Sequence, residues 1–155
     1  MKNRIGLSEK TVKENTDLLN VLIADEYVLF TKTRNYHWNV ARGNFQELHK
    51  FFDDQYAILD EQIDEIAERV RMLGETPVAR LKDFLKLSHL KEETVTETSE
   101  MIESLLHDHE HIITHLRKDI KITAENEDAG TCDFLTKVLE VHEKMVWMLA
   151  AYQKK

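Results

Sequence analysis

The sequence predicts an all-α protein folded as a four-helix bundle, and three features of the chain support that fold class. Apolar residues recur at helical spacing over four long segments. The 155 residues include one Pro and four Gly, too few for the turns of a sheet protein. One long connection separates the second segment from the third. Because this length suits one domain, we expect residues 1–155 to form a single bundle.

The first two helices have recognisable ends. Ser8 can cap a helix whose apolar stripe continues to His37, so His37 itself lies in phase with that stripe. The second helix is expected to begin at Phe45 and to stop at Gly74, with Pro77 beyond it. It should be about eight turns long.

The second half of the chain contains the other elements. Residues 75–92 are too many for a bare loop in a compact domain, so we expect a short helix within ARLKDFLKL. A third helix is predicted from about Glu92 to Ile122, and a fourth from about Asp128 to Tyr152. Four long amphipathic helices with one long middle connection are typical of a bundle.

The amino-acid composition limits which partners and which cell compartment the protein can be expected to have. Acidic side chains outnumber basic ones by 29 to 21, a balance that disfavours nucleic acid and favours cations as partners. Cys132 is the single cysteine, MKNRIGLSEK lacks the features of a secretory signal, and no apolar run approaches the ~20 residues that span a bilayer. We therefore expect a soluble protein of the cytoplasm, without a membrane partner.

Four potential metal ligands share one flank of the second helix: His49, Asp53, Asp64 and Glu68. Imidazole with carboxylate suits iron, manganese or zinc. One helix cannot bring all four together, because eleven residues separate Asp53 from Asp64, about 16 Å along the axis. The simpler interpretation involves no metal. Asp64 and Glu68 would then form a solvated flank whose negative charge neighbouring arginines balance, and His49 would be a core residue.

The spacing of these four residues is palindromic. His49 and Glu68 share a midpoint with Asp53 and Asp64, between residues 58 and 59. If two copies of the helix cross antiparallel at that point, the histidine end of one faces the acidic end of the other. Two equivalent metal sites, roughly 20 Å apart, would result.

Two motifs resemble the Dps proteins (DNA-binding proteins from starved cells), which are small members of the ferritin superfamily. The first is HWNVARGNFQELHKFFD, residues 37–53, in which Gly43 falls one residue later than usual, and the second is IDEIAERVRMLGETP, residues 63–77. The resemblance covers nearly the whole chain and implies a ferritin-like bundle.

That resemblance also implies an activity and a site. Dps proteins form a hollow dodecamer from two-fold dimers, oxidise iron(II), preferably with hydrogen peroxide, and store ferric oxide inside, which protects the cell from oxidative damage. The ferroxidase centre would take His37, His49 and Asp53 from one subunit and Asp64 and Glu68 from its two-fold mate. Trp38 is similar to a family tryptophan that can intercept oxidising equivalents, although packing at the dimer interface is as good an explanation.

Further acidic residues are candidates for handling iron. Four of them lie opposite the Phe45 stripe of the second helix, where the resemblance implies a cavity wall on which mineral could nucleate: Glu47, Asp54, Glu61 and Glu65. Four others lie near the start of the last helix, where the family has acidic three-fold pores: Asp128, Asp133, Glu125 and Glu127.

A richer histidine cluster lies in HDHEHIITH, residues 107–115. It does not match the zinc-protease motif H-E-x-x-H. His107, His111 and His115 continue a polar ladder that we expect on the outside of the shell, as a solvated face rather than a zinc or nickel site. His109 falls on the apolar side and is expected in the core, while His89 and His142 have no assigned role.

A bundle-centred di-iron site is excluded, because it requires Glu-x-x-His pairs and no histidine here has Glu three residues before it. A non-enzymatic helical protein that compacts DNA or binds a partner is the alternative function. DNA binding should be weak or absent, because the net charge is −8 and the two ends of the chain offer few basic residues. Near the start these are Lys2, Arg4, Lys10 and Lys13, with Glu9 and Glu14 among them. At the other end they are Lys154 and Lys155.

Overall fold

A computed structural model describes residues 5–41 and 44–153 of the chain, and within them it has five α-helices and no β-strand. The helices are α1 (Glu9–Asn39), α2 (Phe45–Met72), α3 (Leu81–Leu87), α4 (Thr98–Glu125) and α5 (Ala129–Gln153). The all-α prediction, including the short helix between the second and third long helices, is confirmed.

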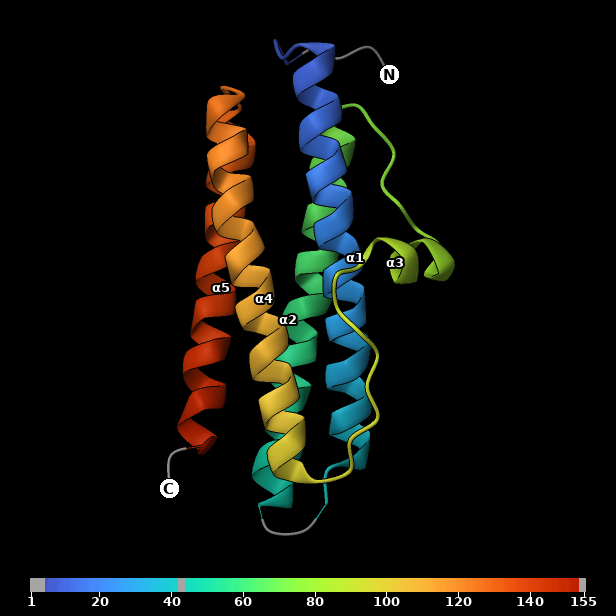
Figure 1. Cartoon of the computed structure of the whole chain (residues 1–155), viewed down its shortest axis with the longest axis vertical. Coiled ribbons are helices and arrows are strands. Elements are labelled where there is room, and N and C mark those ends of the chain that lie inside the picture. The colour runs from blue at the N-terminus through green and yellow to red at the C-terminus, as the bar shows by residue number, and fades with distance from the viewer. Residues whose placement is uncertain (1–4, 42–43, 154–155) are drawn as a thin grey trace.

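The four long helices lie side by side as two antiparallel hairpins, α1 with α2 and α4 with α5 (Figure 1). The segment after α2 passes through α3, which packs on α1, and returns along the bundle to the other end. Helix α4 therefore starts at the same end as α2 and runs parallel to it. Within the described residues, no helix is long and apolar enough to cross a membrane.

Helix α1 begins, and helix α2 ends, where the sequence places the corresponding signals. The Ser8 hydroxyl accepts a hydrogen bond from the backbone N–H of Thr11 at 3.0 Å and so caps α1. Past α2, Gly74 adopts a φ of 98°, which a residue with a side chain rarely adopts. The N–H of Glu75 then reaches the carbonyl of Val70 at 3.2 Å and closes the helix end.

The predicted start of the third long helix is wrong by about one and a half turns. Helix α4 begins at Thr98 rather than at Glu92. The chain before it is not helical because it covers the side of the bundle: Val95 packs against the core, and the carboxylate of Glu93 accepts a hydrogen bond from Ser104 at 2.8 Å. Helical spacing extends into this segment, but tertiary contacts decide its conformation.

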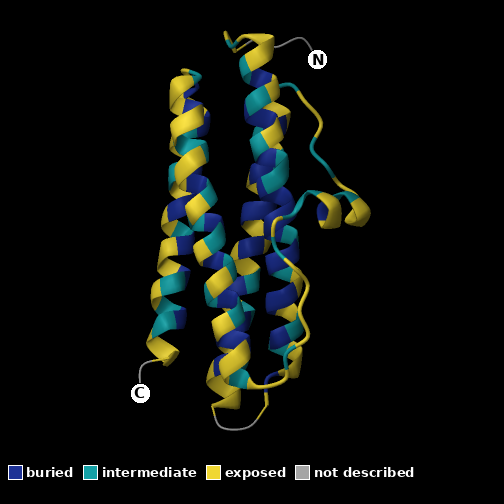
Figure 2. Ribbon diagram, in the orientation of Figure 1, coloured by how far each residue is buried: buried dark blue, intermediate teal, exposed yellow. Residues whose placement is uncertain are grey.

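Apolar side chains from all five helices fill the core, and the exposed residues face outward (Figure 2). The core also contains a polar chain. His142 donates from Nε2 to Glu26 at 2.7 Å, which leaves its Nδ1 to accept from Nδ1–H of His109 at 2.9 Å. All three residues have no exposed surface, so the core position predicted for His109 is confirmed.

The corner between α4 and α5 is fixed by one buried carboxylate. Asp128 is 4% exposed and accepts from the backbone N–H of Thr131 at 3.0 Å, so it caps α5. It also accepts from Asn15 of α1 at 2.9 Å and from Arg69 of α2 at 3.1 Å. One side chain thereby joins three helices at this end of the bundle.

Some sequence expectations lie outside the described residues. These are the turn at Gly43 and the basic residues at the two ends: Lys2, Arg4, Lys154 and Lys155.

Candidate metal centre

The side chains of His37 and His49 lie face to face where α1 ends and α2 begins. Their ring centroids are 3.8 Å apart. Nδ1–H of His37 donates to the carbonyl oxygen of His49 at 2.8 Å, and Nδ1–H of His49 donates to the carbonyl oxygen of His37 at 2.9 Å. Because a carbonyl can only accept, both rings carry their proton on Nδ1, and each Nε2 keeps a lone pair for a metal.

Asp53 lies one turn beyond His49 on α2 and is held by two neighbours. The Tyr56 hydroxyl donates to its Oδ1 at 2.5 Å, and Lys50 lies 3.5 Å from its Oδ2. The hydrogen bond from Tyr56, together with the hydrogen bond and charge of Lys50, outweighs partial burial and keeps the pKa of Asp53 below its usual 3.8. The carboxylate is therefore ionised and oriented at neutral pH.

Asp64 and Glu68 lie on exposed positions of the same helix, farther along α2. Since α2 is continuous, Asp64 is about 16 Å beyond Asp53. A single chain therefore does not bring the five predicted ligands together. The shared centre stays a prediction that needs a second chain.

Trp38 is 65% exposed and follows His37 directly. The guanidinium of Arg34 lies 5.3 Å from the Trp38 ring centroid and 5.6 Å from the Tyr56 ring centroid. Arg34 thus bridges the aromatic rings beside the first predicted ligand and beside Asp53.

The candidate nucleation residues share one property, since all four are exposed on α2: Glu47, Asp54, Glu61 and Glu65. Only Asp54 has a described ion-pair partner among them, Lys50. The other three carboxylates carry no described ion pair and can meet cations from solution.

The four candidate pore residues differ in their surroundings. Glu125 and Glu127 are exposed at the α4–α5 corner. Asp133 is exposed on α5, with Lys137 at 2.8 Å. Asp128 is buried and its carboxylate is already occupied by three partner residues, so it is not free to bind passing cations.

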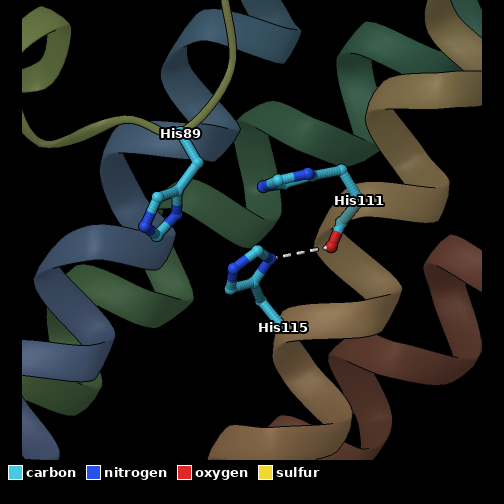
Figure 3. Close-up of side chains that lie close together, drawn as sticks. All are labelled: His89, His111 and His115. Atoms are coloured by element: carbon cyan, nitrogen blue, oxygen red, sulfur yellow. Dashed lines mark hydrogen bonds between the residues drawn. The ribbon is translucent and has the colours of Figure 1, made fainter.

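The histidine ladder of α4 does not lie on a solvated face as expected. His107 is exposed, but His111 and His115 are half-buried and meet His89 from the segment after α3 (Figure 3). The expectation was wrong because the segment between α3 and α4 covers this side of α4, and the periodicity of α4 by itself does not indicate that segment. Sequence periodicity gave no signal for His89, which lies outside any helix.

Comparisons with known proteins give a consistent family. Residues 16–155 match the family model of the ferritin-like domain. The chain is similar to DNA protection during starvation protein 2 of Bacillus anthracis, with 38% identity over 141 residues, 90% of this chain and 97% of the relative.

Two solved structures are similar over nearly the whole chain. The Dps protein of Vibrio cholerae, described as a member of a broad superfamily of ferritin-like diiron-carboxylate proteins, has a TM-score of 0.95 at 32% identity and covers 98% of this chain and 96% of its own. The Dps protein of Bacillus brevis has a TM-score of 0.91 at 34% identity, over 96% of this chain and 100% of its own.

Proposed function

The chain belongs to the Dps family of ferritin-like proteins, and we propose that it is a ferroxidase that oxidises iron(II) at sites shared between two subunits and stores the iron(III). Hydrogen peroxide is the preferred oxidant, and the working assembly is a hollow dodecamer in the cytoplasm. Iron and peroxide are removed together, which protects the cell from oxidative damage.

The proposed centre takes His37, His49 and Asp53 from one subunit and Asp64 and Glu68 from its two-fold mate. Imidazole nitrogens suit iron(II), and carboxylates suit the harder iron(III), so the mixed set can hold the substrate before and after it loses an electron. The reciprocal hydrogen bonds of His37 and His49 fix both rings with Nε2 free.

Each residue has a defined task in the reaction. The two imidazoles and the Asp53 carboxylate position iron(II), and Tyr56 keeps that carboxylate oriented. Two iron(II) ions supply one electron each to hydrogen peroxide, which takes up two protons and leaves as two water molecules. Exposed Trp38 lies next to the site and can donate an electron to a stray oxidising radical.

The paths to and from the centre use exposed carboxylates. Asp133, with Glu125 and Glu127, is the better candidate for the entry pore, and we assign Asp128 to holding the corner that positions them. Glu47, Asp54, Glu61 and Glu65 are proposed to bind iron(III) and to start the mineral. Clustered negative charge attracts Fe²⁺, and salt weakens that attraction.

One observation carries the proposal: His37 and His49, from different helices, each anchor the other's ring and present an unused Nε2 beside an ionised Asp53. The palindromic spacing on α2 supplies the missing acidic ligands from a second copy.

A double variant tests the centre. Replacing His37 and His49 together by Ala should reduce the initial rate of iron(II) oxidation by peroxide to the protein-free background. His107→Ala, which removes an exposed imidazole from α4, is the matched control and should keep the parental rate. Size-exclusion chromatography checks the assembly, and near-parental oxidation by an assembled double variant would contradict the assignment.

Iron-soaked crystals test the geometry independently. Anomalous scattering should place iron between α2 helices of two subunits, in pairs about 20 Å apart across the two-fold axis. Iron found inside a single bundle would overturn the shared centre.

DNA binding is proposed to be weak. Similar proteins include one named for DNA protection during starvation, yet each subunit here carries a net charge of −8. Phosphate repulsion should keep the assembly off DNA at physiological salt.

A further inference from the structure

Three histidines that the proposed ferroxidase does not use meet at the side of one bundle. His111 and His115 lie one turn apart on α4, and His89 comes from the segment that follows α3 (Figure 3). Each offers one potential ligand atom, and these atoms all lie within 4.8 Å of one another. Among the residues that the structure describes, this is the one such group of three.

Neighbouring oxygen atoms fix the orientation of two of the rings. Nδ1–H of His115 donates to the carbonyl oxygen of His111 at 3.0 Å. Nδ1 of His89 lies 3.3 Å from a carboxylate oxygen of Asp25, to which it can donate. These two contacts hold the rings of His115 and His89 in place, as the outer partners of metal-binding histidines do.

The third ring has a nitrogen without a partner. Nε2 of His111 is buried and has no hydrogen-bond partner among the described residues. A cation bound by the three rings would give this buried nitrogen a partner.

Asp25 supports the site from α1. It is 2% exposed and accepts from the Ser88 hydroxyl at 2.8 Å and from the backbone N–H of His89 at 2.6 Å. The carboxylate thus fixes both the backbone and the ring of His89. Although His89 lies outside any helix, these bonds give it the rigid placement that a metal ligand needs.

An acidic residue that borders the same side of the bundle lies one turn farther along α4. Asp119 lines a cavity of about 270 Å³ together with Asp25, His89 and His115. Its carboxylate, or a water molecule in the same cavity, would complete four-coordination.

We propose that His89, His111 and His115 form a second metal site, within a single subunit, that binds zinc or a similar divalent transition-metal ion. A ligand set dominated by imidazole favours such ions over magnesium or calcium. The bound ion joins the segment before α4 to α4, and through Asp25 to α1. It is a structural staple, and it differs from the ferroxidase centre in needing no second chain.

Zinc binding should be measured by calorimetry in a background that lacks the interface ligands, with His37 and His49 replaced by Ala. We expect one zinc ion per chain in this background. His89→Gln, which changes only a loop side chain, and His111→Ala with His115→Ala should each abolish this binding. His107→Ala, one turn before His111 and exposed, is the control and should bind as the background does.

Two further measurements separate a built site from surface binding. Cobalt(II) should give the strong visible absorption of a four-coordinate ion in the background and lose it in His89→Gln. Asp25→Asn should weaken zinc affinity by roughly 10- to 100-fold, as expected for a residue that orients a ligand. Circular dichroism confirms that each variant is helical.

The outcomes are distinct from those for iron oxidation. Equal zinc affinity in the background and in folded His89→Gln would overturn the proposal, as would an equal loss in His107→Ala. Because the readout is zinc or cobalt binding, the test stands even if the parent protein oxidised no iron.

Discussion

The hydroxyl of Tyr56 lies 2.5 Å from Oδ1 of Asp53, a residue of the proposed iron site. The donor is on the same helix, three residues later, so the pair is preorganised within one turn. The bond stabilises the ionised carboxylate and is the largest cause of the lowered pKa of Asp53.

Tyr56→Phe should therefore narrow the pH range of iron oxidation. Without the donor, the pKa of Asp53 rises, so protons displace iron at a higher pH and the acidic limb of the rate profile moves upward. Initial rates measured from pH 4 to pH 7 should show this shift, with little change at pH 7. The control is Tyr152→Phe, at the far end of α5, and an unchanged acidic limb in Tyr56→Phe would show that Asp53 does not titrate with activity.

Asp128 should be important for stability rather than for iron. In Asp128→Ala, α5 loses its cap, at about 1 kcal/mol, and the guanidinium of Arg69 loses its buried partner. We expect a loss of about 3 kcal/mol, measured by urea denaturation. Asp133→Ala removes an exposed ion pair on the same helix and should cost less than about 0.5 kcal/mol.

The pH dependence of this contribution has a definite sign. Burial alone would raise the pKa of Asp128, but hydrogen bonds from Thr131 and Asn15 and the charge of Arg69 outweigh it, so the pKa is below the usual 3.8. The stabilisation is therefore present above pH 3.8 and is lost as pH falls through the lower, folded pKa. An equal loss of stability on acidification in Asp128→Ala and the parent would contradict this role.

The sequence predicted the helices well because their stripes, caps and stops are local signals. Ser8 caps the first turn of α1, and Gly74 follows the last turn of α2, so each signal lies within one turn of the helix end that it marks. The start of α4 was mispredicted because Val95 and Glu93 are held by contacts with distant parts of the chain. No local pattern encodes such contacts.

The same distinction applies to the sites. His49, Asp53, Asp64 and Glu68 are on one helix, so their spacing could be interpreted before the fold was known. His89 joins His111 and His115 only because the segment after α3 crosses α4, and the sequence separation of more than twenty residues hides this. Burial of Asp128 likewise depends on Asn15 and Arg69, which come from two other helices.

The buried His109 should make folding less favourable in mild acid. Burial, and then the neighbouring His142, hold its pKa well below the usual 6.5, whereas the unfolded chain binds a proton at about that pH. The unfolded state therefore gains protons first as pH falls below 6.5, and stability decreases by up to about 1.4 kcal/mol per pH unit.

His109→Gln, which keeps a donor for His142, should reduce this pH dependence. Urea midpoints at pH 7 and pH 5.5 should differ less in the variant than in the parent, while exposed His107→Gln should behave like the parent. Equal pH dependence in all three proteins would mean that His109 does not remain neutral in the fold.

The last prediction concerns iron entry past Asp133. Three copies of this exposed carboxylate around a pore would concentrate negative potential and draw in Fe²⁺. Asp133→Asn should slow iron uptake by roughly tenfold at low ionic strength, and the difference should shrink as salt screens the charge. Asp17→Asn is a matched control, because Asp17 also forms an exposed ion pair with a lysine four residues away on its own helix. Iron uptake should be measured on protein from which zinc has been removed. In the same protein, the rate of iron(II) oxidation at low iron concentration reports the ferroxidase centre separately. If Asp133→Asn took up iron like Asp17→Asn at both ionic strengths, the entry path would have to lie elsewhere, because a carboxylate at a narrow opening cannot be removed without changing the potential that the cation meets.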